Sequence, residues 1–572
     1  MKFTPLGVVL FGLALGFDPI HASEKKSSTP VVEADLCIYG GTSGGVVAAV
    51  QAARLGKTVV IIEPGQHLGG MTAGGLSWTD VGNSDRVGAV GGLAREVYER
   101  IGAHYGQKPG TAFDVPNTPE QLRMAVDFSK PPSLAFEPHV AEAIFVALAK
   151  EARATVHLGQ ALASVRKEGT RIREIVTANG TVFRAHVFLD ATYEGDLMAQ
   201  AGISHTVGRE ANAQYAETLN GIQPPAVSGR SGKFDVPIDP YVVPGNPASG
   251  ILPYLLRTEP LGTVGAADER VQSYNFRVCL TDNPANRIPL GTPANYREAN
   301  YELLARWTEA RVAAGENLTL RSYLKYDPLQ NGKFDFNNRW PISTDFLGGA
   351  DHYPRASPEK RKQIASAHED YLRGFFHFLA TSPRVPAAVR EEMSRFGLCK
   401  DEFTGTGGWP HQIYVREARR MVGSFVMTEH EVRGPRVAPQ SVGLGAYGVD
   451  MHAVRRLVVD GRPVNEGSNG GSVPQPYPIA YGAIVPKLSE CENLFVTFCL
   501  SASHVAFGSI RMEPVFMTLS QAAATAASLA IDGKVPVQRV NYDKLRARLL
   551  ADRVVLDWPI PTASETVATE KK

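Results

Sequence analysis

The sequence predicts an α/β fold whose main sheet is assembled from two distant parts of the chain, with a long insertion between them. Near the start, a strand pattern at 35–39, a helix pattern at 44–55 and a strand pattern at 57–62 form one βαβ unit. Near the end, a strand pattern at 494–499 and an alanine-rich helix pattern at 514–531 have the same apolar character. The stretch between them is rich in Pro, Gly, Asn and aromatic residues, so we expect it to form a separate part.

The sequence marks where the first helix ends and where a second α/β stretch follows. Gly56 stands where the helix should stop, because glycine adopts a positive φ at a C-cap without steric cost. A second α/β stretch follows, with a helix at 140–152 and strands at 156–158 and 187–189. We expect this stretch to join the same sheet, and we expect Cys37 in the first strand to be a buried, inert thiol.

The length of the chain indicates more than one part. It has 572 residues, and a single hydrophobic core rarely grows beyond roughly 250–300 residues. Helix patterns at 298–313 and 358–379 lie within the insertion. We divide the sequence into a signal peptide at 1–22, a linker at 23–32, a first α/β part at 33–205, an inserted part at 206–480, a last α/β part at 481–535 and a C-terminal tail at 536–572.

The first residues have the plan of a cleaved signal peptide. One Lys precedes an apolar run at 6–17, and Ile20-His21-Ala22 follows just before Ser23. A membrane anchor is the alternative, but the run is shorter than the roughly 20 residues that span a bilayer. We therefore expect export to the periplasm or the outside of the cell, and no membrane span in the mature chain.

Charge and cysteine content narrow the classes of partner. Lys plus Arg is 59 and Asp plus Glu is 58, so the chain has no general field that would attract nucleic acid. We expect a small-molecule substrate instead. The five cysteines are few and widely spaced, and no CxxC occurs, so we expect neither a disulfide scaffold nor a metal centre.

The strongest motif is the turn between the first strand and the first helix. It consists of Gly40, Gly41, Thr42, Ser43, Gly44 and Gly45. Glycines there let a pyrophosphate approach the backbone at a helix N-terminus, where free N–H groups and the helix dipole meet its charge. Glu63 ends the next strand, close to the spacing at which a carboxylate binds a ribose. Thr42 replaces the second glycine of the GxGxxG pattern, and a glycine turn without a ligand is the alternative interpretation.

Three further segments favour a flavin dinucleotide over a nicotinamide one. The expected cofactor contacts are Gly69, Gly70 and Met71, then Ala191 and Thr192, then Arg511, Met512 and Pro514. The first two segments could also be simple turns. Pro514 suits the first turn of a helix, because its missing N–H costs nothing there. That helix start would stabilise negative charge at the flavin N1 and C2 oxygen.

Together these segments resemble a known family, the FAD-dependent oxidoreductases that also include the flavin subunit of heterodisulfide reductase. The resemblance covers about 33–531 and is closer to secreted bacterial members, some of them labelled xanthan lyase-like. It implies FAD, a discontinuous FAD-binding Rossmann domain like that of glutathione reductase, and an inserted α+β substrate domain. The clustered cysteines of the heterodisulfide reductase relatives are absent here, so iron–sulfur clusters are not implied.

Three histidines are candidates for the base that takes a proton while hydride leaves the substrate. His504 ranks first because it precedes the flavin-facing helix, His411 follows Trp409-Pro410, and His452 could pair with Asp450. A structural histidine, or a turn at Asp450, is the alternative for each. Three arginines could bind a substrate carboxylate, but a solvated helix face is the favoured interpretation for Arg416, Arg419 and Arg420.

These observations lead to one function and two alternatives. We expect a secreted FAD-dependent oxidoreductase that transfers hydride between a small polar organic substrate and flavin N5, with a carbohydrate-derived substrate as one option. The electron acceptor is unknown, and a covalent flavin link at His67 stays open. The alternatives are an NAD-dependent dehydrogenase and a catalytically silent binding protein that retains the flavoprotein fold.

Overall fold

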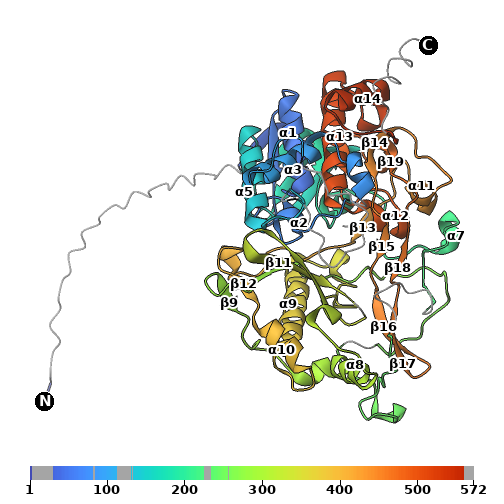
Figure 1. Cartoon of the computed structure of the whole chain (residues 1–572). Coiled ribbons are helices and arrows are strands. Elements are labelled where there is room, and N and C mark those ends of the chain that lie inside the picture. The colour runs from blue at the N-terminus through green and yellow to red at the C-terminus, as the bar shows by residue number, and fades with distance from the viewer. Residues whose placement is uncertain are drawn as a thin grey trace.

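The computed structural model describes residues 1–2, 30–81, 84–111, 131, 133–224, 234–254, 257–339 and 341–559. The molecule has a helix-rich α/β part at one end and a mixed part of strands and helices at the other (Figure 1). The beginning of the chain, in blue, and its end, in red, meet in the α/β part. The middle of the chain, in green to orange, forms the other end.

The α/β part is built on a seven-stranded sheet in the order β3-β2-β1-β6-β5-β4, with β20 also paired to β6. Five strands run parallel to one another: β1 (Val31–Tyr39), β2 (Val59–Ile62), β3 (Thr155–His157), β6 (Val182–Asp190) and β20 (Leu494–Val496). All four residues of β2 are buried and apolar, as is typical of a parallel strand covered on both faces. Since β20 pairs with β6, the end of the chain completes the sheet that the beginning starts.

Strand β6 has two neighbours on the same edge. Its first half pairs antiparallel with β5 (Arg171–Thr177), and β5 in turn pairs antiparallel with β4 (Leu162–Glu168). Its second half pairs parallel with β20, where Leu494 lies opposite Phe188. The residues that follow β6 and β20 are therefore brought to the same end of the sheet.

Helices from both ends of the chain pack together over this sheet. They are α1 (Ser43–Arg54), α2 (Gly70–Ala73), α3 (Gly92–His104), α5 (Pro138–Glu151) and α13 (Glu513–Gly533). Helices α1 and α13 make the most extensive helix pair of the structure. Within the described residues, α13 is also the one helix long and apolar enough to cross a membrane, but 89% of its apolar window is buried inside the protein.

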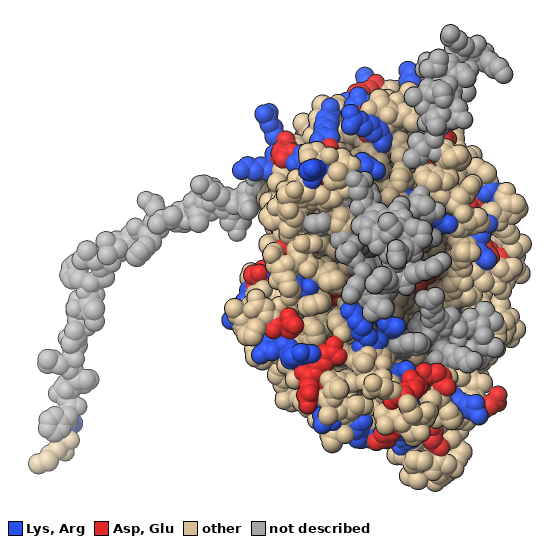
Figure 2. Space-filling model, viewed as in Figure 1, with Lys and Arg blue, Asp and Glu red and all other residues tan. Residues whose placement is uncertain are grey.

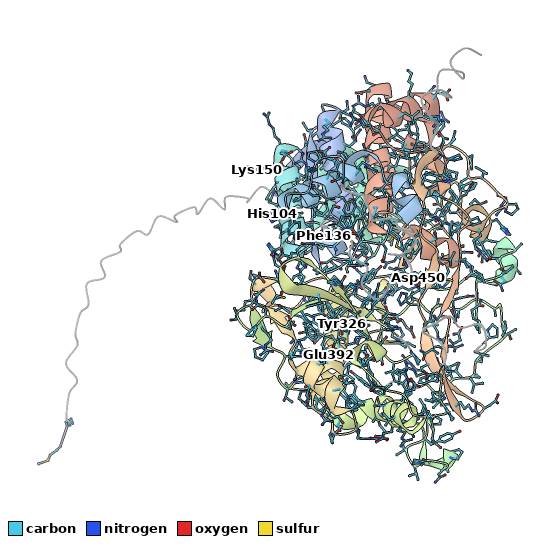
Figure 3. The ribbon with its side chains drawn as sticks, viewed as in Figure 1. His104, Phe136, Lys150, Tyr326, Glu392 and Asp450 are labelled. Atoms are coloured by element: carbon cyan, nitrogen blue, oxygen red, sulfur yellow. The ribbon has the colours of Figure 1, made fainter. Side chains whose placement is uncertain are left out.

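The second part is a five-stranded antiparallel sheet in the order β10-β11-β8-β12-β9, with three helices. Its elements are β8 (Val278–Thr281), β9 (Arg287–Pro289), β10 (Leu324–Pro328), β11 (Lys333–Asn338), β12 (Gly397–Cys399), α8 (Glu302–Ala313), α9 (Pro358–Thr381) and α10 (Ala387–Ser394). Aromatic side chains fill its interior, for example Phe336 against Phe396 and Phe376. Tyr326 and Glu392 hydrogen-bond in this part and lie close together in Figure 3.

Shorter elements complete the described structure. The helices are α6 (Asp196–Gln200), α7 (Asn212–Tyr215), α11 (Glu429–Arg433), α12 (His504–Ile510) and α14 (Tyr542–Ala551). The strands are β7 (His205–Val207), β13 (Arg419–Met421), β14 (Ser441–Gly445), β15 (Val449–Met451), β16 (Arg455–Val459), β17 (Arg462–Glu466), β18 (Asn469–Gly471) and β19 (Tyr477–Ala480). They form antiparallel pairs between β13 and β7, β14 and β19, β15 and β18, and β16 and β17.

Most sequence-based elements lie within a few residues of their expected places. Strand β1 begins at Val31, before the expected 35, because Val31 pairs with Val182 of β6. The helix expected at 298–313 is divided, with a 3-10 turn before α8. The expected C-terminal tail contains α14, which packs on α13. Nearly all of the expected signal peptide at 1–22 lies outside the described residues.

Charged side chains of both signs share the surface. Over the lower half of the face in Figure 2, basic and acidic residues lie next to one another. Ion pairs of the protein include Arg384 with Glu302 and Glu309. This mixture agrees with the near balance of 59 basic and 58 acidic residues in the sequence.

The close approach of α1 and α13 gives a direct test of the packing. A Cβ added at Gly44 would lie 2.5 Å from Ser520 Oγ and 2.6 Å from Phe498 Cε2. We predict that Gly44→Ala lowers the free energy of unfolding by about 1–3 kcal/mol, the usual cost of overpacking a core, measured by urea denaturation. Gly533→Ala on α13 is the control, since its nearest neighbour would be 3.6 Å away. Equal stability of the two variants would contradict this packing.

Candidate functional site

The glycine turn after β1 is held so tightly that side chains are excluded at both ends. Gly40 has φ +107°, and a Cβ there would lie 2.8 Å from the carbonyl group of Ala191. A Cβ at Gly45 would lie 2.0 Å from the Gly40 oxygen. The turn therefore leads directly into the N-terminus of α1, whose first N–H groups have no partner within the helix.

Thr42 occupies the position of the expected second glycine without closing the turn to a ligand. It is the N-cap of α1, and its Oγ1 accepts a hydrogen bond from the Gly45 N–H at 3.1 Å. The same hydroxyl donates to the Ala191 carbonyl at 2.8 Å. The side chain is 5% exposed and directed into the protein, so it replaces the glycine at this position by capping the helix.

Glu63 lies beside the turn, as its spacing predicts. Its carboxylate accepts hydrogen bonds from the N–H groups of Gly41 and Gly65, both at 2.6 Å. Burial raises the pKa of Glu63 to about 7, although these two N–H groups act in the opposite direction. A carboxylate has further lone pairs for two ribose hydroxyls, so the residue fits the role expected from the sequence.

The segment around Gly69 returns to the same turn. Its N–H donates to the Gly41 carbonyl at 2.8 Å, and Gly69 and Gly70 both have positive φ angles, of 99° and 54°. The N–H of Met71 donates to the Tyr193 hydroxyl at 2.8 Å. This second loop therefore borders the glycine turn on one side and Tyr193 on the other.

The segment after β6 forms a third wall. Asp190 accepts hydrogen bonds from Thr192 Oγ1 at 2.6 Å and from the Met198 N–H at 2.9 Å. Burial raises the pKa of Asp190 to about 6. Ala191 contacts Gly40 and Thr42, as described above, while Thr192 shapes the loop by accepting from the Gly195 N–H at 3.0 Å. The expected turn is thus also a wall of the site.

A buried carboxylate joins these walls to the end of the chain. Glu513 is the first residue of α13 and is 5% exposed. It accepts hydrogen bonds from Ser43 Oγ at 2.6 Å, Thr72 Oγ1 at 2.7 Å and Tyr193 OH at 2.7 Å. Burial raises the pKa of Glu513, and these donors oppose the rise. The N-termini of α1 and α13 are therefore held together at one point.

The expected flavin-facing residues lie at the start of α13. Met512 is its N-cap and Pro514 lies in its first turn. Arg511 donates to the hydroxyl of Tyr414 at 2.8 Å and to the carbonyl of Asp450 at 2.8 Å. Figure 3 shows Asp450 at the boundary between the α/β part and the second part. The start of α13 is thus linked to the inserted part as well as to α1.

A small cavity opens at this junction. It is lined by Tyr193, Tyr414, Val415, Arg416, Glu417, Phe498, Phe507, Arg511, Glu513 and Phe516. Arg416 and Arg511 are buried, and the Nε atom of each has no hydrogen-bond partner among the described residues. The walls thus combine aromatic rings, two cations and two carboxylates, a mixture that suits a polar organic ligand.

His504 stands behind one wall of the cavity. Its Nδ1 lies 2.8 Å from both carboxylate oxygens of Glu417, which also forms an ion pair with Arg420. Burial raises the pKa of Glu417, but His504 and Arg420 outweigh it and hold that pKa below its ordinary value. The structure therefore places Glu417, rather than the ring of His504, on the wall of the cavity.

His452 forms a second histidine–carboxylate cluster beside the cavity. Its Nδ1 lies 2.7 Å from Asp345 and its Nε2 lies 3.4 Å from Asp450. Asp345 also pairs with Arg416 at 2.9 Å, and Asp450 pairs with Arg511 at 3.2 Å. His452 therefore contacts the partners of both cavity arginines, which links it to the cavity through them.

His411 belongs to a different cluster. It stacks on His67 with ring centroids 3.8 Å apart, and His67 Nδ1 lies 2.8 Å from Glu142. Burial and the neighbouring His67 lower the pKa of His411 to about 4, while Glu142 raises the pKa of His67. His411 is not among the residues that line the cavity. Its place beside the Gly69 segment suits a structural contact between the two parts.

The favoured interpretation of the three arginines, a solvated helix face, is wrong, because none of them lies on a helix. Arg416 and Arg420 are 2% and 0% exposed, and Arg420 lies in strand β13 rather than on a helix. Arg420 pairs with Glu210 at 2.6 Å and with Glu417. Arg419 pairs with Asp196 at 2.7 Å and is partly buried. Carboxylates from distant segments form ion pairs with these arginines, and these pairs hold the guanidinium groups inside the protein.

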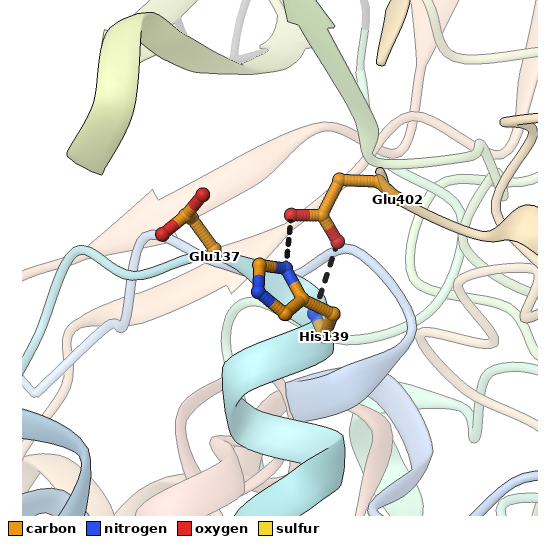
Figure 4. Close-up of side chains that lie close together, drawn as sticks. All are labelled: Glu137, His139 and Glu402. Carbon is orange, nitrogen blue, oxygen red and sulfur yellow. Dashed lines mark hydrogen bonds and ion pairs between the residues drawn. The ribbon is translucent and has the colours of Figure 1, made fainter. Parts of the chain in front are cut away.

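One cluster has the donor set of a metal site. Glu137, His139 and Glu402 lie close together, and His139 hydrogen-bonds to Glu402 (Figure 4). The ammonium group of Lys333 lies 2.6 Å from a carboxylate oxygen of each glutamate. Because Lys333 pairs with both carboxylates and His139 with one of them, the cluster is explained as a buried ion-pair network.

Sequence reasoning missed three residues of the junction, namely Tyr193, Glu417 and Glu513. Each lies within a segment that the sequence marks, but its partners lie far away in the chain. The separations are 87 positions for Glu417 and His504, 320 for Tyr193 and Glu513, and 470 for Ser43 and Glu513. A glutamate followed by proline at a helix start is the one local signal that could have indicated Glu513, because acidic groups favour that position.

The comparisons decide which dinucleotide this geometry serves. A family model described as FAD dependent oxidoreductase matches residues 35–549. The chain belongs to this family. It is an FAD-dependent oxidoreductase, and FAD is its cofactor. The glycine turn, the helix N-terminus and Glu63 fit the adenosine and pyrophosphate of FAD, and the second and third walls converge on the same turn.

Solved structures add only distant likenesses. A mutant of NikD, an unusual amino acid oxidase essential for nikkomycin biosynthesis, is 15% identical over 31% of this chain and 57% of its own, with a TM-score of 0.22. L-amino acid deaminase from Proteus vulgaris is 15% identical over 28% and 52%, with a TM-score of 0.20. The OxyS anhydrotetracycline hydroxylase from Streptomyces rimosus is 16% identical over 32% and 36%, with a TM-score of 0.21. The chain thus spans less than two thirds of each, and no curated protein matches its sequence.

The Glu513 junction can be tested by removing its carboxylate. We predict that Glu513→Ala lowers the free energy of unfolding by about 3 kcal/mol, because the buried hydroxyls of Ser43, Thr72 and Tyr193 lose their acceptor. We also expect purified protein to lose part of its FAD, measured as the ratio of flavin to protein absorbance. Glu513→Gln keeps an acceptor oxygen and should retain more FAD. Full FAD content and unchanged stability in Glu513→Ala would show that the hydrogen bonds to Glu513 do not hold the cofactor site together.

The raised pKa of Glu63 predicts a pH dependence of stability in FAD-free protein. The unfolded chain releases this proton near 4.5 and the folded chain near 7, so the folded state binds more protons between these values. Its stability should fall as the pH rises through this window. Glu63→Gln should remove that component, seen as a flatter plot of urea midpoint against pH. An identical plot for the two proteins would rule out the assigned pKa.

Proposed function

We propose that this flavoenzyme is exported and that it oxidises a small polar organic substrate at the junction between the start of α13 and the inserted part. When bound, FAD supplies the hydride acceptor at its N5. The observation that carries the proposal is the shared cavity wall. Arg511 and Glu513 come from the cofactor side, and Tyr414, Arg416 and Glu417 come from the inserted part. Residues of the cofactor side and of the inserted part therefore line one small cavity.

Glu417 is the residue we propose to accept the substrate proton. Its lowered pKa keeps it ionised at neutral pH, and an ionised carboxylate is able to take a proton. His504 donates from Nδ1 to Glu417 in the tautomer that this hydrogen bond favours. His504 then acts as a positioning residue that orients the carboxylate and keeps it charged.

Tyr414, Arg416 and Arg511 are proposed to orient the substrate. Arg511 donates to the Tyr414 hydroxyl, and the Arg416 guanidinium lies over the Tyr414 ring at 4.8 Å. Both cations are held by carboxylates, Asp345 for Arg416 and Asp450 for Arg511. The walls thus offer N–H and O–H donors without a large excess of charge, which suits hydroxyl groups or a single carboxylate on the substrate. Sugars and sugar acids meet this description.

Export is proposed from the sequence at 1–22, and the glutathione-reductase-like arrangement with an inserted substrate domain is proposed from two features. The sheet order β3-β2-β1-β6 with a terminal β20 supports a discontinuous cofactor domain. The antiparallel sheet around β8 and β11 supports a distinct substrate domain.

The function is tested by anaerobic reduction of the bound flavin. We expect the visible flavin absorbance to bleach with at least one compound in a panel of sugars, sugar acids, hydroxy acids and amines. Glu417→Gln should lower the bleaching rate by about 100-fold or more while keeping FAD bound, as for loss of a general base. His504→Gln should move the acid limb of the rate profile to higher pH, because His504 lowers the pKa of Glu417.

His411→Asn is the control for this experiment, since His411 lies in the His67 cluster and not on the cavity wall. It should bleach at nearly the rate of the unchanged protein. Photoreducible flavin that no compound in the panel bleaches would favour a silent binding protein instead. An undiminished rate in Glu417→Gln would remove Glu417 from the mechanism.

A further inference from the structure

Two buried cysteines face each other in the second sheet. Strands β8 and β12 are antiparallel neighbours, with Leu280 opposite Leu398. The next position along each strand brings Cys279 opposite Cys399, and their Sγ atoms are 3.9 Å apart. Both side chains are buried, at 1% and 0% exposure. These thiols are 120 positions apart in the sequence, so only the fold brings them together.

The geometry of the strands suits a disulfide bond. Directly opposite residues of antiparallel strands have Cα atoms about 4.5–5.5 Å apart, which lies within the range of about 4.4–6.8 Å found across disulfides. The sulfur atoms must approach to about 2 Å, and rotation of the two side chains can provide this. Apolar residues surround the pair, namely Trp78, Ala135, Leu329 and Phe403. The charged groups that act on Cys279, Glu402 and Lys333, pair with each other at 2.6 Å.

The other three cysteines have different surroundings. The thiol of Cys499 contacts the carbonyl of Tyr193 at 3.2 Å, and that of Cys491 contacts Asn493 at 3.6 Å. Cys37 belongs to a separate apolar cluster beneath the main sheet. The facing arrangement on adjacent strands thus distinguishes Cys279 and Cys399.

We propose that Cys279 and Cys399 form a disulfide bond when the chain folds in an oxidising compartment. The oxidant is a disulfide-bearing compound such as oxidised glutathione or a thiol–disulfide oxidoreductase. One cysteine first forms a mixed disulfide with it, and the other attacks that sulfur and displaces the oxidant's thiolate. In total the two thiols lose two protons and two electrons, and the oxidant's disulfide is reduced to two thiols.

The bond has to close before the sheet is fully packed. The hydrogen bond from Cys399, together with burial, holds the pKa of the Cys279 thiol well above its ordinary value. Since the thiolate is the reacting form, exchange is disfavoured once the native strands have closed around the pair. The compartment in which the chain folds therefore decides the redox state.

The bond would stabilise the strand against which the segment after Met71 packs. Two residues before Cys279, Arg277 pairs with Asp335 at 2.5 Å, and Asp335 accepts from the Trp78 N–H at 3.0 Å. A Cβ at Gly75 would lie 2.2 Å from the Arg277 carbonyl. A link between β8 and β12 thus restrains the strand against which the segment after Met71 packs.

The test compares full-length protein exported to a bacterial periplasm with protein made in the cytosol. Each sample is unfolded in an alkylating agent, digested without reductant and analysed by mass spectrometry. Exported protein should yield a peptide containing Cys279 joined to one containing Cys399, two hydrogen atoms lighter than the separate peptides. Thiol titration should find three free thiols in exported protein and five in cytosolic protein. Reductant should lower the melting temperature of exported protein by about 5 °C.

Cys279→Ser and Cys399→Ser should each abolish the linked peptide and the response to reductant, while Cys491→Ser should keep both. The unchanged protein provides the decisive result even if a variant fails to fold. Five free thiols in the exported, FAD-containing protein would overturn the proposal, and so would a link that joins other cysteines. The outcome does not depend on the substrate, so it can fail while the proposed oxidation stands.

Discussion

The hydrogen bonds to the buried carboxylate of Glu513 are the interaction on which the cofactor site depends. Ser43 lies at the start of α1, Thr72 lies in α2 and Tyr193 follows β6, yet all three donate to one residue at the start of α13. Burying a carboxylate is costly unless its oxygens are hydrogen-bonded, so this arrangement is stable only when all four segments are in place. The site is therefore complete only in the fully folded chain.

The same junction explains how the inserted part takes part in the chemistry. Arg511 immediately precedes the start of α13 and reaches Tyr414 and Asp450 from the inserted part. Buried ion pairs such as Arg420 with Glu210 then fix the segment that carries Glu417. Such pairs contribute little net stability but are costly to break, so they favour one arrangement of the cavity wall. The catalytic proposal rests on that arrangement.

The sequence predicted the parts of the site that depend on local backbone geometry. The turn at Gly40, a helix start near Gly44 and the approach of Glu63 follow from glycine conformations and from βαβ spacing. The structure has the turn and the approach of Glu63, and its helix α1 begins one residue earlier, at Ser43. The roles of Glu417 and Glu513 could not be predicted, because their partners come from other segments of the chain. The burial of the arginines could not be predicted for the same reason. A cluster such as Arg416 to Arg420 looks solvent-exposed until the buried carboxylates opposite it are known.

Hydrogen–deuterium exchange of FAD-free and FAD-bound protein tests the central claim most directly. If one cofactor is held by both ends of the chain, FAD should slow exchange at the start of α1, near residues 40–46, and at the start of α13, near residues 511–516, to a similar extent. Protection of the first segment alone, with α13 unchanged, would contradict a site assembled from two distant parts of the chain.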